Sequence, residues 1–344
     1  MLFVLMACKR EPVSYLGPAY IAAPEGFAVT SFTGTPSPVN FQTTTVAFNA
    51  TFTHTVTYSL TIVGQTSGAK LVRSGVANGI TNELWKGEMD GPFFFRDGEN
   101  AIATLSFFGT SLTSSVTINI TKVQNYTTCG TYPRFGDFET PSKVEPQPIP
   151  PYYSAYWASF NYPTPIPNVT QGVDSVAVDY NGKPVPSVQG KKYYFIKGLG
   201  DQPVFVSGLQ YFGSLIPYLN ADPNRVWFNI YIYGTGDANA SVDIEMQEDD
   251  IDGTTGGYQG DDDDAMVAHV TLNHKGWKLF SFRYNTLVPS SNLPFGGSGN
   301  HIHEPNRIRS WDIVLLKKSN PNSPVEVYFD YPLFTLDRPF KPCK

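Results

Sequence analysis

The 344-residue chain lacks a recognisable catalytic motif, an internal repeat and a helical heptad pattern. It also lacks clusters of lysine and arginine beyond pairs such as Lys191–Lys192 and Lys317–Lys318, and its formal net charge is −6. Because binding to nucleic-acid phosphates needs a basic surface, this charge pattern argues against nucleic acid as a partner. The missing catalytic motif leads us to expect a protein that is not an enzyme.

The apolar run at the start, Met1–Ala7, is too short to span a bilayer, which takes about 20 apolar residues. It resembles the end of a secretory hydrophobic region, although no positively charged segment precedes it. The stretch Leu5-Met6-Ala7-Cys8 is similar to a bacterial lipobox, in which the cysteine is acylated. The resemblance implies that Cys8 carries lipid chains and anchors the protein to a membrane. The alternative is a free cysteine.

Cysteine is scarce, with three residues in the chain. Besides Cys8, the chain contains Cys129 and Cys343, a pair that fits an exported protein in an oxidising compartment. A bridge between them would close a loop of about 214 residues (343 − 129) and contribute about 5 kcal/mol in the chain-entropy model. The same two residues could also remain free thiols.

Charged residues make up only 16% of the chain, whereas 14% are aromatic and there are 30 glycines and 28 prolines. Aromatic and β-branched residues suit pleated strands, and glycine and proline mark turns, so we predict an all-β protein. Residues 1–26 are expected to hold the end of a lipoprotein signal and a proline-rich tether. A β-sandwich over 27–125 and a larger one over 129–344 would follow.

The first sandwich is predicted from short runs of Thr, Val, Phe and Ile that turn residues separate, for example 43–52, 55–63 and 101–108. Leu84-Trp85-Lys86-Gly87 and the later Gly98-Glu99 resemble two turns of immunoglobulin-like modules in bacterial surface proteins. The resemblance implies an immunoglobulin-like sandwich.

The most regular pattern of the second sandwich lies between residues 226 and 233. Aliphatic and aromatic side chains alternate with aromatic and polar ones, which predicts a strand with two unlike faces. One face would carry Val226, Phe228, Ile230 and Ile232, and the other Trp227, Asn229, Tyr231 and Tyr233.

Three stretches resemble strands of the galactose-binding-like jelly rolls in carbohydrate-binding modules. They are Phe135–Glu139, Gly276–Phe282 and Val325–Phe334. The resemblance implies a jelly roll that binds glycan and holds a structural Ca²⁺ through Asp137, Glu139 and Asp330, since Ca²⁺ takes several hard oxygen ligands. The alternative is that these carboxylates belong to a turn and to a solvated strand end.

Sugar binding needs exposed aromatic rings on which the sugar faces stack, together with planar polar groups for the hydroxyls. A proline-rich segment is dense in such rings, and the strand described above adds two more. The predicted glycan-binding residues are Tyr152, Tyr153, Tyr156, Trp157, Tyr231 and Tyr233. The alternative is that these aromatic residues are buried in the sandwich.

Residues 248–264 form an acidic, glycine-rich loop whose crowded carboxylates need water or a cation to disperse their charge. We favour a solvated loop over a Ca²⁺ site there, because the glutamate of an EF-hand is missing. Glu245 and Glu248 do not match the motif by which jelly-roll glycosidases place two carboxylates in a cleft. His301 and His303 could ligate a metal with Glu304, but an exposed loop is the favoured interpretation.

These observations predict a lipid-anchored protein of the Bacteroidota type at the outer membrane or cell surface, with the periplasmic face left open. Its jelly roll would bind a glycan without catalysis and would serve a neighbouring outer-membrane transporter or enzyme. The alternative is a structural or adhesion lipoprotein whose jelly roll binds a protein. An exposed row of aromatic and planar polar groups would favour glycan, and a broad apolar patch would favour protein.

Overall fold

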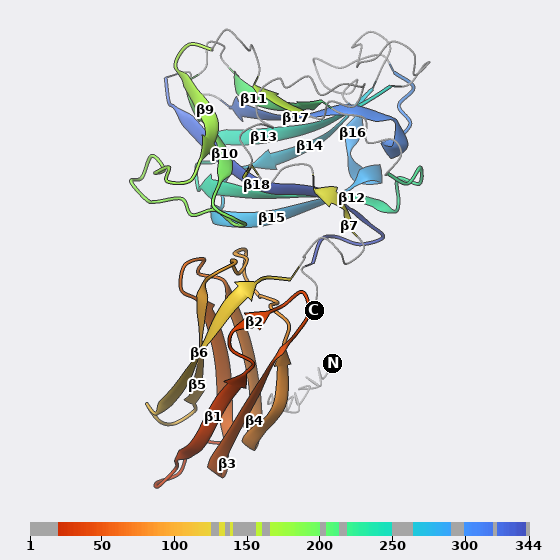
Figure 1. The fold of residues 1–344 in the computed structure, drawn as a ribbon. Coiled ribbons are helices and arrows are strands. Elements are labelled where there is room, and N and C mark those ends of the chain that lie inside the picture. The colour runs from red at the N-terminus through yellow and green to blue at the C-terminus, as the bar shows by residue number, and fades with distance from the viewer. Residues whose placement is uncertain are drawn as a thin grey trace, which may run out of the picture.

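The computed structural model describes residues 20–124, 131–134, 138–139, 156–159, 166–199, 204–212, 219–249, 264–289, 299–318 and 322–341. Within these ranges the regular elements are strands and two short 3-10 turns, η2 (Tyr284–Thr286) and η4 (Pro305–Arg307), so the all-β prediction is confirmed. No helix among the described residues has the length and apolar character needed to cross a bilayer. The strands form an N-terminal and a C-terminal domain, one above the other in Figure 1.

The N-terminal domain consists of six strands around one core. β3 pairs with β1 along its first half and with β5 along its second half, and β4 lies along its other side. We predicted two strands, at 43–52 and 55–63; the structure has one long strand whose register with β4 shifts between Thr51 and Val56. The strands are β1 (Val29–Thr35), β2 (Val39–Asn40), β3 (Val46–Gly64), β4 (Lys70–Trp85), β5 (Asn100–Phe107) and β6 (Thr113–Lys122).

The core of this domain is aromatic. Trp85, from the predicted Trp-x-Gly turn, is fully buried, with its ring centroid 4.7 Å from that of Phe41 and 5.0 Å from that of Phe95. Such tilted and edge-on ring pairs contribute about 1 kcal/mol beyond the burial of their area. The immunoglobulin-like connectivity stays a prediction.

The C-terminal domain is a sandwich of two six-stranded antiparallel sheets, which confirms the predicted jelly roll. The domain-facing sheet lies next to the N-terminal domain, and the distal sheet lies above it (Figure 1). The strand order of the domain-facing sheet is β15-β12-β18-β10-β9, with β7 beside β18. The strand order of the distal sheet is β16-β14-β13-β17-β11-β8. The domain-facing strands are β7 (Thr131–Arg134), β9 (Val169–Asp174), β10 (Tyr193–Gly198), β12 (Val226–Thr235), β15 (Lys275–Arg283) and β18 (Val325–Leu336). The distal strands are β8 (Tyr156–Ser159), β11 (Phe205–Phe212), β13 (Ala240–Glu248), β14 (Ala265–Thr271), β16 (Val288–Pro289) and β17 (Ile308–Lys317).

Alternate residues of the strands fill the core between the two sheets. From β12 these are Val226, Phe228, Ile230 and Ile232, each at most 1% exposed, so the predicted aliphatic face of this strand is confirmed. They pack with Ile244, Trp311 and Ile313 from the distal sheet. Full burial of one such side chain contributes about 1.5–3 kcal/mol to stability.

The two domains meet at an aromatic joint, which we define as Phe94 of the N-terminal domain with Tyr231, Tyr331 and Phe340 of the jelly roll. Phe94 is fully buried, and its ring centroid lies 5.0 Å from Tyr331, 5.9 Å from Tyr231 and 6.2 Å from Phe340. The rings belong to the same buried cluster as the N-terminal core, so the outer face of the domain-facing sheet is packed against the first domain.

The pairing of β7 with β18 bears on the predicted disulfide. Cys129 and Cys343 lie outside the described residues, but Thr131 of β7 lies opposite Thr335 of β18. Along the chain, Cys129 lies two residues before Thr131, and Cys343 lies eight residues after Thr335. The bridge between the two cysteines stays a prediction.

We expect non-reducing mass spectrometry of the native protein to find a peptide in which Cys129 is linked to Cys343. Reduction should lower the midpoint of thermal unfolding, because a bridge over so long a loop restricts the unfolded chain. Alkylation of both thiols in the native protein without prior reduction would rule the bridge out.

Candidate functional site

The predicted aromatic platform, which consists of Tyr152, Tyr153, Tyr156 and Trp157, is only partly within the described residues. Tyr152 and Tyr153 lie outside them, and Tyr156 and Trp157 begin strand β8, where only the backbone is described. In the register with β11, Trp157 lies opposite Tyr211, a core residue that is 6% exposed, and Tyr156 lies opposite Phe212. Because opposite residues of an antiparallel pair project to the same side, position 157 belongs to the core side and position 156 to the outer side.

Tyr231 does not provide the exposed ring that we predicted. Its side chain is 3% exposed and lies under Phe94 in the joint. Burial raises the pKa of its hydroxyl well above the usual range. The alternation of β12 places this ring correctly on the outer face, but the N-terminal domain covers that face, which the sequence pattern does not reveal.

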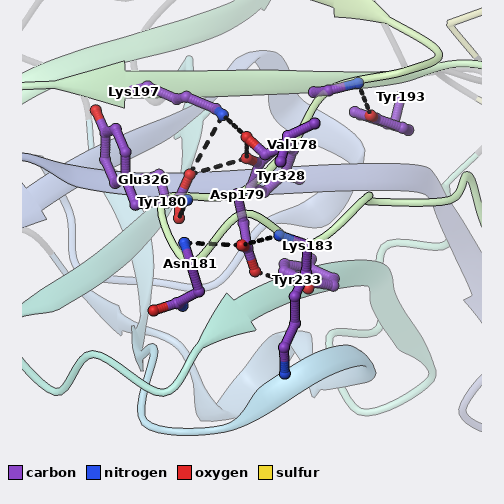
Figure 2. Close-up of polar contacts among 11 residues, drawn as sticks. Val178, Asp179, Tyr180, Asn181, Lys183, Tyr193, Lys197, Tyr233, Glu326 and Tyr328 are labelled. Atoms are coloured by element: carbon purple, nitrogen blue, oxygen red, sulfur yellow. Dashed lines mark hydrogen bonds and ion pairs between the residues drawn. The ribbon is translucent and has the colours of Figure 1, made fainter.

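Tyr233 is also buried, at 8% exposed, so the prediction of an exposed ring is wrong here too. Figure 2 shows that it belongs to a polar network on the same face of the sheet, under residues 177–183. Its hydroxyl donates to Asp179 Oδ2 at 3.1 Å, and the backbone amides of Asn181 and Lys183 donate to Asp179 Oδ1 at 2.9 Å each. Burial, with the hydrogen bond to Asp179, raises the pKa of Tyr233 to about 12.

A second part of this network centres on Glu326, which is 3% exposed. Tyr328 Oη donates to Glu326 Oε2 at 2.8 Å, and the amide of Tyr180 donates to Glu326 Oε1 at 2.7 Å. Lys197 Nζ lies 3.4 Å from Glu326 Oε2, 5.1 Å from the centroid of the Tyr328 ring, and donates to the carbonyl of Val178 (Figure 2). These contacts fix residues 177–183 on the sheet, so we assign the network a structural role.

Two of the three predicted Ca²⁺ ligands approach one chain segment, residues 186–192. Asp330 Oδ2 accepts hydrogen bonds from the amides of Val188 and Gln189, at 2.9 and 3.1 Å. Glu139 Oε1 accepts from the amides of Lys191 and Lys192, at 2.6 and 2.7 Å. Asp137 lies outside the described residues.

This pair of carboxylates has the features of a cation site. Asp330 is fully buried, and burial raises its pKa well above the usual range, with a further contribution from Glu139. Among the described residues, Asp330 Oδ1 and Gln189 Oε1 are both buried without a hydrogen-bond partner. Unpartnered buried oxygens are costly, and a hard cation with six to eight oxygen ligands would satisfy them. No group of three or more His, Cys, Asp or Glu side chains suited to a metal occurs in the described parts of the chain. The fit therefore depends on amide and backbone oxygens as well.

The distal sheet carries a different arrangement on its outer side. We define its polar face as Gln210, Glu245, Gln247, Ser310 and Asp312, which come from three adjacent strands. The register places Asp312 opposite both Glu245 and Gln210, and Gln247 opposite Ser310. Alternation explains their orientation, because Ile244, Met246, Trp311 and Ile313 between them point into the core.

Hydrogen bonds link the polar face across the strands. Gln210 Nε2 donates to Gln247 Oε1 at 3.2 Å, and Gln247 Nε2 donates to Asp312 Oδ2 at 2.8 Å. Ser310 Oγ also donates to Gln247 Oε1. Gln247 and Asp312 are 6% and 4% exposed, whereas Glu245 and Gln210 are half-buried. Asp312 Oδ1 is buried and has no hydrogen-bond partner among the described residues.

The two carboxyl groups of this face favour their protonated forms. Burial, with a smaller contribution from Asp243, raises the pKa of Glu245 to about 7. Burial and then the nearby Glu245 raise the pKa of Asp312 well above its usual range. A neutral carboxyl group donates one hydrogen bond and accepts others, so at pH 6 this face offers both donors and acceptors.

Glu248 does not pair with Glu245. It lies opposite Ile308, a core residue, after a register shift, and its Oε1 accepts from Tyr284 Oη at 2.6 Å and from the amide of Glu304 at 2.7 Å. The two glutamates therefore occupy different sides of the distal sheet. Residues 250–263 of the acidic loop lie outside the described residues.

The predicted alternative metal ligands His301 and His303 do not come together on a shared ligand. His303 Nε2 lies 2.8 Å from the carbonyl oxygen of Leu287, whereas His301 Nδ1 lies 3.5 Å from Asp264 Oδ1. The side chain of Glu304 lies 3.0 Å from Arg307 Nε. The favoured interpretation of an exposed loop holds for His301, which is exposed, whereas His303 and Glu304 are half-buried.

No protein-family model and no curated protein matches the chain. Carbohydrate-binding-module β-sandwiches are among the solved structures that resemble it. The family 11 module from Clostridium thermocellum in complex with a β-1,3-1,4-mixed-linked tetrasaccharide is 13% identical, with a TM-score of 0.38 over 60% of this chain and 97% of that chain. A family 22 module from Clostridium thermocellum is 10% identical, with a TM-score of 0.32 over 61% and 96%. A xylan-binding domain from Paenibacillus barcinonensis is 15% identical, with a TM-score of 0.29 over 53% and 86%. At these values we take no ligand or function from the similarities.

Sequence reasoning missed the polar face and Gln189. A partial signal for the face existed, since Glu245 and Asp312 each stand between two apolar residues in the sequence. Their meeting depends on the register of β13 against β17, which the sequence alone does not give. Gln189 carries no local signal, because its role depends on Asp330, which is far away in the chain.

We predict different outcomes for alanine substitutions at two adjacent positions of β8. Trp157→Ala should lower the free energy of unfolding by about 3–5 kcal/mol, because position 157 belongs to the core side. Tyr156→Ala, the matched control on the outer side, should change it by less than about 1 kcal/mol. Chemical denaturation of both variants measures this, and an unaltered Trp157→Ala stability would show that the residue lies outside the core.

Proposed function

We propose that the protein binds a glycan, without catalysis, through the polar face of its distal sheet. The observation that carries the proposal is that the two outer faces of the jelly roll differ. The domain-facing sheet is covered by the N-terminal domain and by residues 177–183, whereas the distal sheet carries a row of carboxyl and carboxamide groups. Planar polar groups of this kind match the paired hydroxyls of sugars, and they fix a ligand by hydrogen bonds.

Asp312 and Glu245 are the central residues of this proposal. Asp312 is oriented by Gln247, and its buried Oδ1 has no hydrogen-bond partner among the described residues, so a sugar hydroxyl that reaches this oxygen would supply the missing hydrogen bond. Glu245, opposite Asp312 and half-buried, supplies a donor while it is protonated. Tyr156, on the outer side of the adjacent strand β8, is the aromatic position retained from the predicted platform. Tyr152 and Tyr153 remain predicted contributors.

The electrostatics of the face support binding rather than hydrolysis. A retaining glycosidase needs one ionised carboxylate as nucleophile beside a protonated acid. Burial raises the pKa of Glu245 to about 7 and that of Asp312 well above its usual range, so neither carboxyl group has the lowered pKa that would keep such a nucleophile ionised. The face also lacks the broad apolar character that the alternative, a structural or adhesion protein binding a protein partner, would need.

We also propose a structural Ca²⁺ at Asp330 and Glu139, with Gln189 as an additional ligand and Asp137 as predicted. The unpartnered oxygens of Asp330 and Gln189 support this fit. Ca²⁺ would neutralise the two nearby carboxylates and bring their oxygens to a common centre. It would act on stability and not on a reaction.

For location, we propose that Cys8 carries the lipid anchor at the outer membrane or cell surface, beside a transporter or enzyme that uses the captured glycan. A Cys8→Ser variant should then be soluble in cell fractionation and should not incorporate palmitate analogues, because the anchor needs the thiol. Cys129→Ser is the matched control and should remain in the membrane. Membrane retention of the Cys8→Ser protein would contradict the anchor.

Glycan binding can be tested with the soluble Cys8→Ser protein on a glycan array, followed by calorimetric titration of the polysaccharide that binds. Asp312→Asn should weaken binding about tenfold, since loss of one good hydrogen bond to a buried group costs about 1–2 kcal/mol. Asp97→Asn, a matched change on the N-terminal domain, should leave it unaltered.

The pH dependence of glycan affinity tests the role of Glu245. Wild-type affinity should fall from pH 6 to pH 8, because Glu245, with a pKa of about 7, loses its donating proton over this range. Glu245→Gln keeps a donor at every pH, so its affinity should stay nearly constant. Absence of binding to any glycan on the array would refute the function, and equal binding by wild type and Asp312→Asn would refute the site.

A further inference from the structure

The segment that approaches the proposed cation site also carries the contacts of the N-terminal domain. The amide of Phe94 donates to the carbonyl of Val188 at 3.0 Å. Arg96 Nη2 donates to Ser187 Oγ at 2.9 Å and lies 3.4 Å from the Ser187 carbonyl oxygen. We call residues 186–192 the docking segment, since it forms the polar part of the joint between the domains.

The docking segment faces the two carboxylates with its amides while it faces the N-terminal domain with its carbonyls. Val188 shows this most clearly, because its N–H donates to Asp330 Oδ2 and its C=O accepts from Phe94. One residue thus connects a buried carboxylate in β18 to the first domain. A movement of Val188 away from Asp330 would break the hydrogen bond to Phe94 as well.

The docking segment passes close to the side chain of Glu139 at Gly190. Gly190 has a φ of +60°, and a Cβ atom there would lie 2.3 Å from Glu139 Oε1. A side chain at this position would therefore displace either the carboxylate or the segment. The backbone conformation of the docking segment depends on where the two carboxylates sit.

The two carboxylates repel each other when both are ionised. Asp330 has no exposed surface over which water could screen its charge, and Glu139 accepts hydrogen bonds from amides only two and three residues beyond the one at Gln189 that donates to Asp330. A divalent cation shared by their oxygens and by Gln189 Oε1 would replace repulsion by attraction and draw the docking segment toward β18.

We propose that cation binding at Asp330, Gln189 and Glu139 locks the N-terminal domain onto the jelly roll through the docking segment. The proposal rests on the proposed Ca²⁺ site and adds a conformational role to it. With the cation bound, the docking segment is held and the joint is closed; without it, the segment loosens and the two domains separate. The cation would thereby set the direction in which the polar face points relative to the first domain.

Thermodynamic linkage couples the cation site to the interface between the domains, so each can be perturbed and the effect measured at the other. If the cation favours the docked state, docking must favour the cation by the same factor. Disrupting the joint from the N-terminal domain, far from any ligand oxygen, should therefore weaken cation binding. A merely local cation site would not show this effect.

The first experiment is calorimetric titration of the metal-stripped, full-length Cys8→Ser protein with CaCl₂, with MgCl₂ as comparison. Gln189→Ala should weaken Ca²⁺ binding at least tenfold, and Gln42→Ala, the same change at an exposed position of the N-terminal domain, should have no effect. The double variant Phe94→Ala/Arg96→Ala should weaken it about fivefold or more by linkage. Arg96→Ala alone, which leaves the aromatic core intact, should weaken it by a smaller factor in the same direction.

The second experiment is small-angle X-ray scattering of the same proteins with Ca²⁺ and with EGTA. Wild type should show a larger radius of gyration in EGTA than in Ca²⁺, and the double variant should show the larger value in both. Absence of Ca²⁺ binding by the wild type would refute the cation site and with it the lock. Ca²⁺ binding with identical scattering in both conditions, and equal affinity in the double variant, would refute the lock alone. Glycan titration of the same proteins reports on the polar face separately.

Discussion

The burial of strand β12 on both of its faces is the constraint on which the rest of the structure depends. One face supplies Val226, Phe228, Ile230 and Ile232 to the core between the sheets. The other supplies Tyr231 to the joint and Tyr233 to the network under residues 177–183. Among the described residues, the cover over both faces of this central strand leaves the outer side of the distal sheet as the surface on which the proposed glycan site lies. The proposed site is therefore on the side of the jelly roll away from the first domain.

The sequence predicted the strands better than it predicted which residues pack against them. Alternation along β12 is local, so it identified the strand and separated Ile230 from Tyr231 correctly. Whether an aromatic ring on the second face meets water or protein depends on a domain that is remote in the chain. Phe94, which covers Tyr231, lies in an irregular stretch between β4 and β5 with no pattern of its own. An exposed platform and a buried joint therefore look alike in the sequence.

The carboxylates show the same limit of prediction from the sequence. Asp330 and Glu139 were identified by their resemblance to the first and last strands of a known fold, and both approach the docking segment. Gln189, in contrast, becomes a candidate ligand only in the folded chain, where its amide donates to Asp330 and its side-chain oxygen is buried without a partner among the described residues. The pairing of Glu245 with Asp312 likewise follows from strand register, which is set by turns and by the whole hydrophobic pattern. Resemblance and alternation can place single residues, whereas sites made by register need the folded sheet.

Beyond β18, the chain returns to the joint instead of leaving the molecule. The amide of Phe340 donates to Asn229 Oδ1 at 2.9 Å, and the Phe340 ring is 2% exposed beside Tyr331. A recombinant fragment that starts after the first domain would keep both sheets but would present Tyr231, Tyr331, Leu333 and Phe340 to water. Such an apolar area favours self-association. The sequence boundary between the domains is thus a poor place to divide this protein for expression, because the surface that makes the second domain soluble belongs in part to the first.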